Sequence, residues 1–579
     1  YCVEKYGKER VANIVTFGRM AARNAVRDVA RVLQVPYAES DRLAKMIPPP
    51  VQGRHIPLEK SLKENVDLKN EYEHNEQARQ VFDLAMRLEG TIRSHGVHAA
   101  GVVIAPDDIV NFTPLEMAQK GVISTQYSMG PVEELGLLKM DFLGLSNLTI
   151  VKNTLRIVKK VYGEEIDVSS LPLDDPKTYE LLQRGDTTGV FQFESAGMKR
   201  YLRELKPTEF GDIVAMGALY RPGPLSAGLT DSFIKRKNGL EEVTYDHPKM
   251  EAALKGTYGV LVYQEQFMQI SRDVCGFTGG EADTLRKAIG KKKRDMMMKM
   301  EERFISGAVE NGIDKALIEG FWKKLMGFAD YCFNKSHSAC YGMISYWTAY
   351  LKAHYPEAFM ASLMTSDYDD IDRLAIEITE CKYMGITVLS PDVNTSFHEF
   401  AVIKSGDDSP DKIRFGMDAI KNVGSGAVAE IIRAREEAGG FKDLGDFLDK
   451  VSPRIVNKKA LESLIKAGAL DSFGDRSVLL YNVEAMLAHA QRVQKERLSG
   501  QTDLFGGTST SAVAPKLILD ETQPKFTNRE QLIWERELLG LYLSSHPLGE
   551  FEHFLKEQCL PIAEIDKTLD GKMVKIGGS

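Results

Sequence analysis

The residues best suited to chemistry in this chain are Lys139 and Asp141, which stand in the otherwise apolar stretch Leu137–Leu145. In an extended strand alternate side chains share a face, so both would project from the same side of a strand that is normally buried. Burial of uncompensated charge costs roughly several kcal/mol, which predicts a partner for each group. A divalent cation held by Asp141 and a phosphate bound by Lys139 would compensate both. An ordinary Lys139–Asp141 ion pair at the rim of a sheet explains this stretch equally well.

Two further groups of basic residues could bind phosphate. A row at four-residue spacing, on one face of a predicted helix, consists of Arg19, Arg23, Arg27 and Arg31. Such a row suits a nucleic-acid backbone, although a surface network with acidic neighbours has the same spacing. A basic run at 290–294 contains three candidate DNA contacts, Lys291, Lys292 and Lys293. A solvated helix end is the alternative for this run.

A glycine-rich turn formed by Gly424, Ser425 and Gly426 precedes a predicted helix. Backbone N–H groups at the positive end of a helix can hold a phosphate without reading base sequence. Together with Lys421, this turn resembles a helix-hairpin-helix, whose turns bind the DNA backbone. Glu430 stands where alanine is usual, and an ordinary turn at the start of a helix is the alternative.

Residues 499–530 are rich in Gly, Ser, Thr and Pro, which predicts a flexible linker. Within this linker lie Gln501, Asp503, Leu504 and Phe505. An apolar pair exposed in a linker is unusual on a monomer surface. We therefore predict that this peptide anchors in a groove of a partner protein.

The composition limits the class of protein. The 579 residues are 43% hydrophobic and 27% charged, which is typical of a soluble globular protein of roughly three to five domains. No apolar run is long enough to span a bilayer. The six cysteines are scattered without a CxxC pair, which argues against a disulfide framework and a structural zinc and favours the cytoplasm. A net charge of −8 does not exclude nucleic acid, because phosphate binding depends on local patches.

Strands and helices must position these candidate residues. A strand is predicted at Val11–Phe17, a helical section at about 51–89, and, within 93–105, a turn of small residues that enters a buried strand. Helices are predicted at 147–162, twice within 174–206 and over most of 208–360. A further helix follows the turn at 424–426 and ends near Glu437, and two or three more lie within 456–498. An amphipathic pattern is already present at Tyr1, and Lys572–Ser579 has the pattern of a strand that is beginning. We therefore expect part of a longer protein, truncated at both ends.

Eight ordered motifs resemble the C family of polymerases, the bacterial replicative DNA polymerase III α subunits. They are Thr16–Gly18, His98–Ile104, Lys139–Leu145, Gly189–Glu194, Tyr220–Pro224, Tyr263–Gln266, Gly290–Lys293 and Phe333–His337. The resemblance covers the whole chain. It implies template-directed DNA synthesis, with primer–template DNA, deoxynucleoside triphosphates, a sliding clamp and other replicase subunits as partners.

The resemblance implies an α+β multidomain fold. A nucleotidyltransferase-like palm would occupy 1–170, with an inserted thumb-like helical segment at about 40–90. Largely α-helical fingers would follow at 171–400, and a helix-hairpin-helix DNA-binding region at 401–498. The linker at 499–530 would carry the clamp-binding peptide, and 531–579 would hold a helix and the start of an OB-like domain.

Three aspartates hold two Mg²⁺ ions in this family. The resemblance implies that Asp141 is the third aspartate and that Lys139 faces the substrate phosphates. The other two belong to an Asp-x-Asp strand that is absent from this sequence, so we expect the chain alone to be inactive. The alternative is a non-catalytic DNA-binding or scaffold module that keeps the fold. A small-molecule nucleotidyltransferase would leave the clamp peptide and the helix-hairpin-helix unexplained.

The resemblance also implies a nucleotide-binding surface in the fingers. Arg286 and Lys287 match the basic pair that binds the incoming triphosphate, although Lys287 often is an arginine in the family. Arg221 matches part of the same nucleotide-binding surface. So does a motif that consists of Asn334, Lys335, Ser336 and His337. Cys332 stands where relatives commonly have glycine. Some relatives carry an intein at this junction, where a cysteine would serve as the acceptor nucleophile, and the sequence leaves open whether this explains Cys332.

Overall fold

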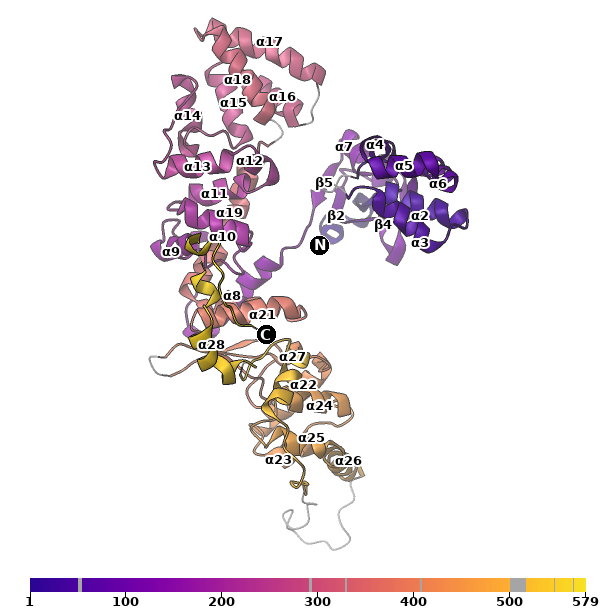
Figure 1. Ribbon diagram of the computed structural model, residues 1–579, viewed down its shortest axis with the longest axis vertical. Helices are drawn as coiled ribbons and strands as arrows, with labels where there is room; N and C mark the ends of the chain where they lie inside the picture. Colours follow the sequence, from indigo (N-terminus) through magenta and orange to yellow (C-terminus); the bar gives the residue numbers. More distant parts are fainter. Residues whose placement is uncertain are drawn as a thin grey trace. The chain divides into compact units, whose positions relative to one another are not determined.

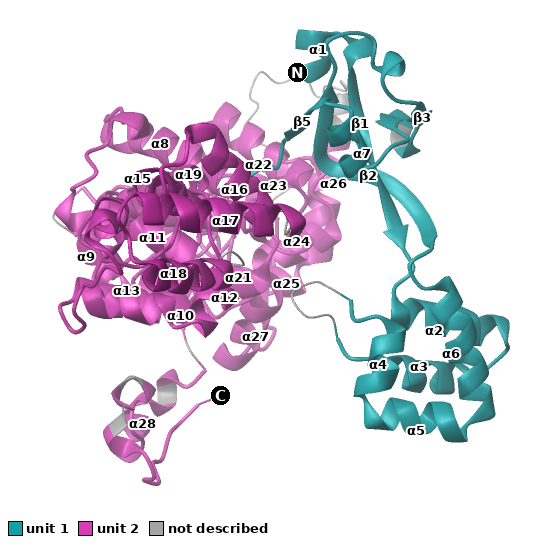
Figure 2. Cartoon of the chain, turned by 90° about the horizontal axis from the view of Figure 1, so that it is seen from above, with its two compact units in different colours: residues 1–145 teal, residues 146–579 magenta. Residues whose placement is uncertain are grey.

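The computed structural model describes residues 1–49, 55–290, 294–328, 331–406, 409–499, 517–545, 547–565 and 567–578. The chain forms two compact units, residues 1–145 and 146–579, which are described separately (Figures 1 and 2). The division at Leu145 precedes the predicted palm boundary at 170. The reason is that α8 (Ser146–Tyr162) packs into the core of the second unit through Ile150 and Val151.

A five-stranded mixed sheet lies at the centre of the first unit, in the order β3-β4-β1-β2-β5. Its strands are β1 (Val11–Arg19), β2 (Ile92–Ile104), β3 (Leu115–Met117), β4 (Ile123–Thr125) and β5 (Leu138–Asp141). β2 pairs antiparallel with both β1 and β5, whereas β4 is parallel to β1. The core of the sheet includes Ile14, Val103 and Val132, the last from α7 (Met129–Glu134). A short α1 (Cys2–Tyr6) precedes β1.

Two predictions for this sheet are wrong. The stretch 93–104 contains no turn and lies entirely in β2, because Gly96 pairs with Thr16 and Ser94 with Gly18 across the β1–β2 ladder. The β5 strand is not buried, since it is the edge strand of the sheet. Leu138 is 57% exposed as a result.

A separate helical bundle is inserted between β1 and β2 (Figure 2). Its helices are α2 (Ala22–Val32), α3 (Tyr37–Met46), α4 (Leu58–Glu64), α5 (Val66–His74) and α6 (Glu76–Leu88). They share their own apolar core, which includes Val26, Leu43, Leu58, Leu68 and Phe82. The predicted helical section at 51–89 therefore corresponds to α4, α5 and α6 in its described part.

The arginine row does not lie on one helix face. Arg19 ends β1 and donates to the Gly90 carbonyl, because α2 begins only at Ala22. The other three bond within the helical bundle: Arg23 to the Ile47 carbonyl, Arg27 to Asp41 and Arg31 to Asp28. The alternative, a surface network with acidic neighbours, fits Arg27 and Arg31, whereas Arg19 and Arg23 bond to backbone carbonyls.

The second unit begins with helices around two apolar cores. The α11–α19 core, which includes Ile213, Leu219 and Tyr346, is built from α9 (Pro176–Arg184), α10 (Ala196–Leu205), α11 (Phe210–Leu219), α13 (Leu229–Lys237) and α19 (Lys335–His354). The short α12 (Pro222–Ser226) connects α11 and α13. The α15–α18 core, which includes Phe267 and Phe321, is built from α14 (Glu251–Leu254), α15 (Gln264–Asp273), α16 (Gly279–Gly290), α17 (Arg294–Glu310) and α18 (Lys315–Phe328).

A third core extends from α8 to the C-terminal helices. It includes α20 (Pro356–Ser366), α21 (Ile371–Tyr383) and a small sheet of β6 (Val388–Leu389), β8 (Lys412–Arg414) and β7 (Ala401–Ile403). It continues through α22 (Ser425–Ala438), α23 (Leu444–Lys450), α24 (Lys458–Lys466), α25 (Arg476–Tyr481), α26 (Val483–Ser499) and α27 (Asn528–Leu539). The packing therefore continues without a break across the predicted fingers boundary at 400.

The C-terminal segments differ from two expectations. The described part of the predicted linker, 517–527, is docked: the Asp520 N–H donates to Asn482 Oδ1 at 2.9 Å, and Phe526 stacks on Tyr481. No strand forms in 572–578, and the last helix described is α28 (Glu552–Gln558). Within the described ranges, no helix is both long and apolar enough to cross a membrane.

Glu377 on α21 is fully buried, and its Oε1 lies 3.4 Å from Arg373 Nη2, but neither carboxyl oxygen accepts a hydrogen bond from the described residues. Burial, assisted by the nearby Asp367, raises the pKa of Glu377 from its usual 4.5 to about 9. Between these values the folded chain holds a proton that the unfolded chain releases. The free energy of unfolding therefore falls as the pH rises through this window.

Glu377→Gln is expected to remove that part of the pH dependence. The neutral amide matches the protonated acid, so the free energy of unfolding at pH 8 should rise by about 1–3 kcal/mol. Urea unfolding at pH 6 and pH 8 measures both effects. Asp372→Asn, at an exposed position of the same helix, is the matched control. An unchanged pH dependence in Glu377→Gln would contradict the assignment.

Candidate nucleotide and nucleic-acid sites

Lys139 and Asp141 lie on the edge strand β5. Asp141 pairs with Gly101 and Lys139 with Val103 of β2, so both side chains lie on the same face. Asp141 is exposed and Lys139 is half-buried. Among the residues that the structure describes, neither side chain has an ion-pair or hydrogen-bond partner. The alternative of a Lys139–Asp141 ion pair is therefore wrong, and both charges are available to a ligand.

The carboxylate of Asp141 has the donor chemistry that the implied Mg²⁺ requires. Carboxylate oxygen is the ligand that Mg²⁺ prefers, and this ion often uses one or two carboxylates together with water and phosphate oxygens. Asp141 fits as one such ligand. Across the described ranges, no three His, Cys, Asp or Glu side chains form a metal-binding cluster, so this chain supplies Asp141 without a complete set of protein ligands.

His98 is a residue near Asp141 that the sequence left without a role. Its Nδ1 accepts the N–H of Gly101 at 2.8 Å and that of Ala100 at 3.2 Å. A Cβ on Gly101 would lie 3.0 Å from the His98 ring, so glycine is required for this close approach. His98 therefore fixes the irregular part of β2 directly opposite Asp141. No spacing rule in the sequence indicates this contact.

A pocket of about 320 Å³ in the second unit brings Arg221 and His337 together. Gln192, Tyr220 and Tyr341 also line it. The His337 and Tyr341 ring centroids are 4.4 Å apart, which gives the pocket an aromatic wall beside a cation. Such walls suit a flat heterocycle, and the arginine suits a phosphate.

Arg221 is held in a fixed orientation within this pocket. Its Nε donates to the Ala218 carbonyl at 2.8 Å, and its Nη2 donates to the Tyr331 carbonyl at 2.7 Å. The guanidinium lies 4.3 Å from the centre of the Phe333 ring. Burial lowers the pKa of Arg221, but arginine remains protonated in proteins.

Two motifs that are distant in the sequence meet at the start of α19. Tyr263 and Phe333 form a parallel bridge, and the Lys335 N–H and the Asn334 amide both donate to the carboxylate of Glu265. Asn334 Oδ1 also accepts the His337 N–H at 2.8 Å as the helix N-cap. Asn334 therefore orients the motif. All four residues of the motif, including Asn334, are exposed.

Arg286 and Lys287 lie on α16 and do not line the described walls of this pocket. Both pair with Asp283, at 2.9 Å in each case. These pairs lower the pKa of Asp283, with Lys287 the largest cause. The pairing could have been predicted from helical spacing, because Asp283 precedes them by one turn. The neighbouring Lys291, Lys292 and Lys293 lie outside the described residues, as do Gln501, Asp503, Leu504 and Phe505.

The turn at Gly424 is open to solvent. Gly424, Ser425 and Gly426 are exposed, and the two glycines have open space where a Cβ would lie. Within the described chain their N–H groups donate no hydrogen bond, as expected at the start of α22. The Ser425 hydroxyl donates to Asp418, which leaves the three N–H groups as the free donors. Lys421 is exposed beside them.

Gly426→Glu is expected to weaken binding to duplex DNA about fivefold to tenfold, because a carboxylate would then meet the phosphates. The fold should persist, since the position is open and acidic residues are favourable in a first helical turn. Fluorescence anisotropy at two salt concentrations measures the change. Gly549→Glu adds the same charge at another exposed glycine and is the control. Equal weakening by both variants would argue against the turn.

Comparison with known families extends these observations. Residues 1–144 match the model of the bacterial DNA polymerase III alpha NTPase domain, and residues 147–312 match the finger domain of the same subunit. Residues 385–479 match a helix-hairpin-helix motif, in agreement with the turn at Gly424.

Curated relatives named DNA polymerase III subunit alpha are similar over nearly the whole chain. The relative from Aquifex aeolicus is 44% identical over 98% of this chain and 48% of its own length. The one from Thermus aquaticus is 46% identical over 99% of this chain and 46% of its own length. The chain thus spans about half the length of the curated relatives it matches. The chain belongs to the family of bacterial DNA polymerase III α subunits.

Proposed function

We propose that this chain is part of a DNA polymerase that transfers a nucleotidyl group from a deoxynucleoside triphosphate to a primer 3′-hydroxyl in bacterial chromosome replication. The observation that carries the proposal is the unpaired Lys139 and Asp141 on the edge strand of a domain that matches this family. The cytoplasm is the proposed place of action, where the six cysteine thiols would stay reduced.

In this reaction the primer hydroxyl attacks the α-phosphorus in line, and pyrophosphate leaves. Mg²⁺, when bound, supplies charge neutralisation at the attacking and leaving oxygens. Asp141 would be one of its ligands, and Lys139 would bind the triphosphate oxygens. Arg221 and His337 would hold the nucleotide in the fingers pocket. The N–H groups of the Gly424 turn would bind the duplex backbone.

Isotope incorporation on a primed template tests this function. We expect Mg²⁺-dependent synthesis by the full-length protein and none by the 579-residue chain alone, because Asp141 is the single family aspartate that this sequence contains. DNA binding without incorporation by the full-length protein would favour the scaffold alternative. Synthesis by the isolated chain would refute the assignment of Asp141 as one ligand of three.

The peptide Gln501–Phe505 is proposed to bind the sliding clamp, which would raise the effective concentration of polymerase at the primer end. In the full-length protein, Leu504→Ala combined with Phe505→Ala should abolish stimulation of synthesis by the clamp. Distributive synthesis without the clamp should remain, because the peptide takes no part in chemistry. Primer extension with and without the clamp measures both. Unchanged clamp dependence would discard the assignment.

A further inference from the structure

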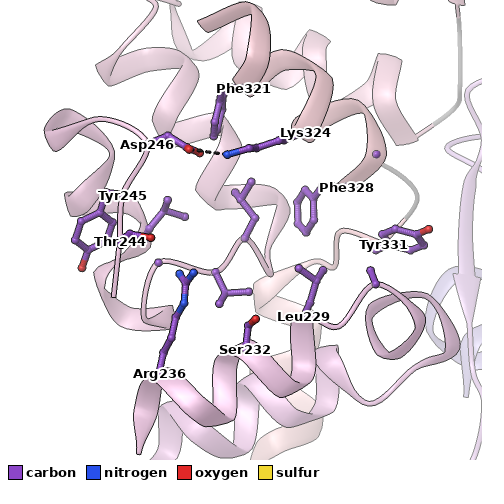
Figure 3. Close-up of a pocket in the computed structure, with 16 residues that line it drawn as sticks. Leu229, Ser232, Arg236, Thr244, Tyr245, Asp246, Phe321, Lys324, Phe328 and Tyr331 are labelled. Carbon is purple, nitrogen blue, oxygen red and sulfur yellow. Dashed lines mark hydrogen bonds and ion pairs between the residues drawn. The ribbon is translucent and has the colours of Figure 1, made fainter. Parts of the chain in front are cut away.

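A cavity of about 580 Å³ lies in the second unit, at the junction of the α11–α19 and α15–α18 cores (Figure 3). It shares no lining residue with the pocket of Arg221 and His337. Its volume is within the range of small-molecule sites, about 300–1,000 Å³. It is therefore a second candidate site in the same unit.

The walls of the cavity are mainly apolar. Phe321 and Phe328 from α18 are 2% and 7% exposed, and Leu229 lies on α13 opposite them (Figure 3). Tyr245 and Tyr331 complete the sides. Aromatic walls of this kind favour a flat ring system, because stacked or edge-on contacts add to apolar burial.

Two cationic side chains of the cavity, Lys324 and Arg236, keep N–H donors that no described residue accepts, although each is paired with one carboxylate. Lys324 Nζ pairs with Asp246 at 2.6 Å, which leaves N–H groups of the ammonium without a partner among the described residues. Arg236 points into the cavity from α13 (Figure 3). Its Nε donates to Glu241 and its Nη1 to the Tyr258 carbonyl, while its Nη2 has no partner within the described ranges. Two cationic donors near one apolar space favour acceptor oxygens with negative charge.

The cavity is linked to the nucleotide pocket through Tyr331. The Tyr331 side chain lines the cavity, and its carbonyl accepts the hydrogen bond from Arg221. The same ring covers Gly223, where an added Cβ would lie 2.2 Å from Tyr331 Cδ1. A molecule packed against this ring would therefore restrain the segment that orients Arg221.

We propose that this cavity binds a small, flat aromatic molecule with one carboxylate, and that binding restrains Arg221 through Tyr331. The rings lie between Phe321, Phe328 and Leu229, and the carboxylate accepts from Lys324 and Arg236. This site is independent of whether the chain takes part in DNA synthesis.

Isothermal titration of the chain with 2-naphthoate tests the site. We expect one binding event, and about fivefold weaker binding of the neutral 2-naphthamide, as for the loss of one exposed ion pair. Leu229→Trp fills the cavity and should weaken binding more than tenfold. Leu240→Trp, at a position that is 77% exposed, is the matched control. Lys324→Met should weaken naphthoate about fivefold and provides a second test if Leu229→Trp fails to fold.

Hydrogen exchange tests the link to Arg221. With 2-naphthoate bound, the amides of 221–225 and 331–337 should exchange more slowly, and this protection should be absent in whichever cavity variant has lost binding. Unchanged affinity in a folded Leu229→Trp chain, or in Lys324→Met, would overturn the site. Binding without protection of these two segments would overturn the link.

Discussion

Asp141→Asn in the full-length protein is expected to reduce DNA synthesis by about 10³-fold or more. An amide lacks the charge with which a carboxylate holds Mg²⁺, and the metal supplies several kcal/mol of transition-state stabilisation. The melting temperature should stay the same. Asp141 is exposed and has no partner within the described chain, so its charge contributes nothing that the fold would lose. Steady-state incorporation and thermal unfolding measure the two properties.

Asp107→Asn is the matched control for this prediction, because Asp107 is an exposed carboxylate in the same unit. It should leave the rate of synthesis unchanged. A rate for Asp141→Asn within tenfold of the parent would remove the carboxylate from the proposed metal site. A large loss of melting temperature would show that Asp141 has a structural role.

Lys352→Met is expected to produce the largest loss of stability, about 3–5 kcal/mol in the free energy of unfolding. The Lys352 ammonium is fully buried and donates to the Asp186 carbonyl at 2.8 Å, the Thr188 carbonyl at 3.0 Å and Glu380 at 2.6 Å. Burial lowers the pKa of Lys352, and the charge of Glu380 opposes that shift. Methionine has a similar shape, but it would leave the Glu380 carboxylate and both carbonyls without this donor.

Urea unfolding followed by circular dichroism measures this effect as a shift in the transition of the second unit. Lys382→Met removes the same charge at an exposed position of α21 and should change stability by less than about 0.5 kcal/mol. Equal shifts in the two variants would mean that the network around Lys352 contributes little. Glu380→Gln combined with Lys352→Met should recover part of the loss, because no buried charge would remain.

Periodicity in short windows was sufficient to predict many helices. The predicted helix at 147–162 is α8, and the two predicted within 174–206 are α9 and α10. The turn predicted within 93–105 is wrong, because Ser94 and Gly96 are held in β2 by pairing with β1. Those partners lie far away in the sequence, and a local window contains no information about them.

For the candidate sites, too, the sequence indicated some features, and other features depend on contacts between distant segments. The family resemblance implied nucleotide binding by Arg221 and His337, but only folding brings them into one pocket. Asn334 was predicted to touch a nucleotide, and in the structure its side chain caps α19 and bonds Glu265. The sequence contained no sign of the cavity beside Tyr331, because its described walls come from four separate segments, 227–236, 244–246, 254–261 and 321–331.

The sequence by itself determined the family and the identity of the charged residues, since these depend on motifs within short stretches of chain. Only the tertiary structure decided which charged side chains have no partner in the described chain. Lys139 and Asp141 have no partners in the described chain. Lys352, in contrast, donates hydrogen bonds to Asp186, Thr188 and Glu380 in a buried network. Whether a charge can act on a ligand depends on the groups that folding brings within hydrogen-bond distance, and these are mostly distant in sequence.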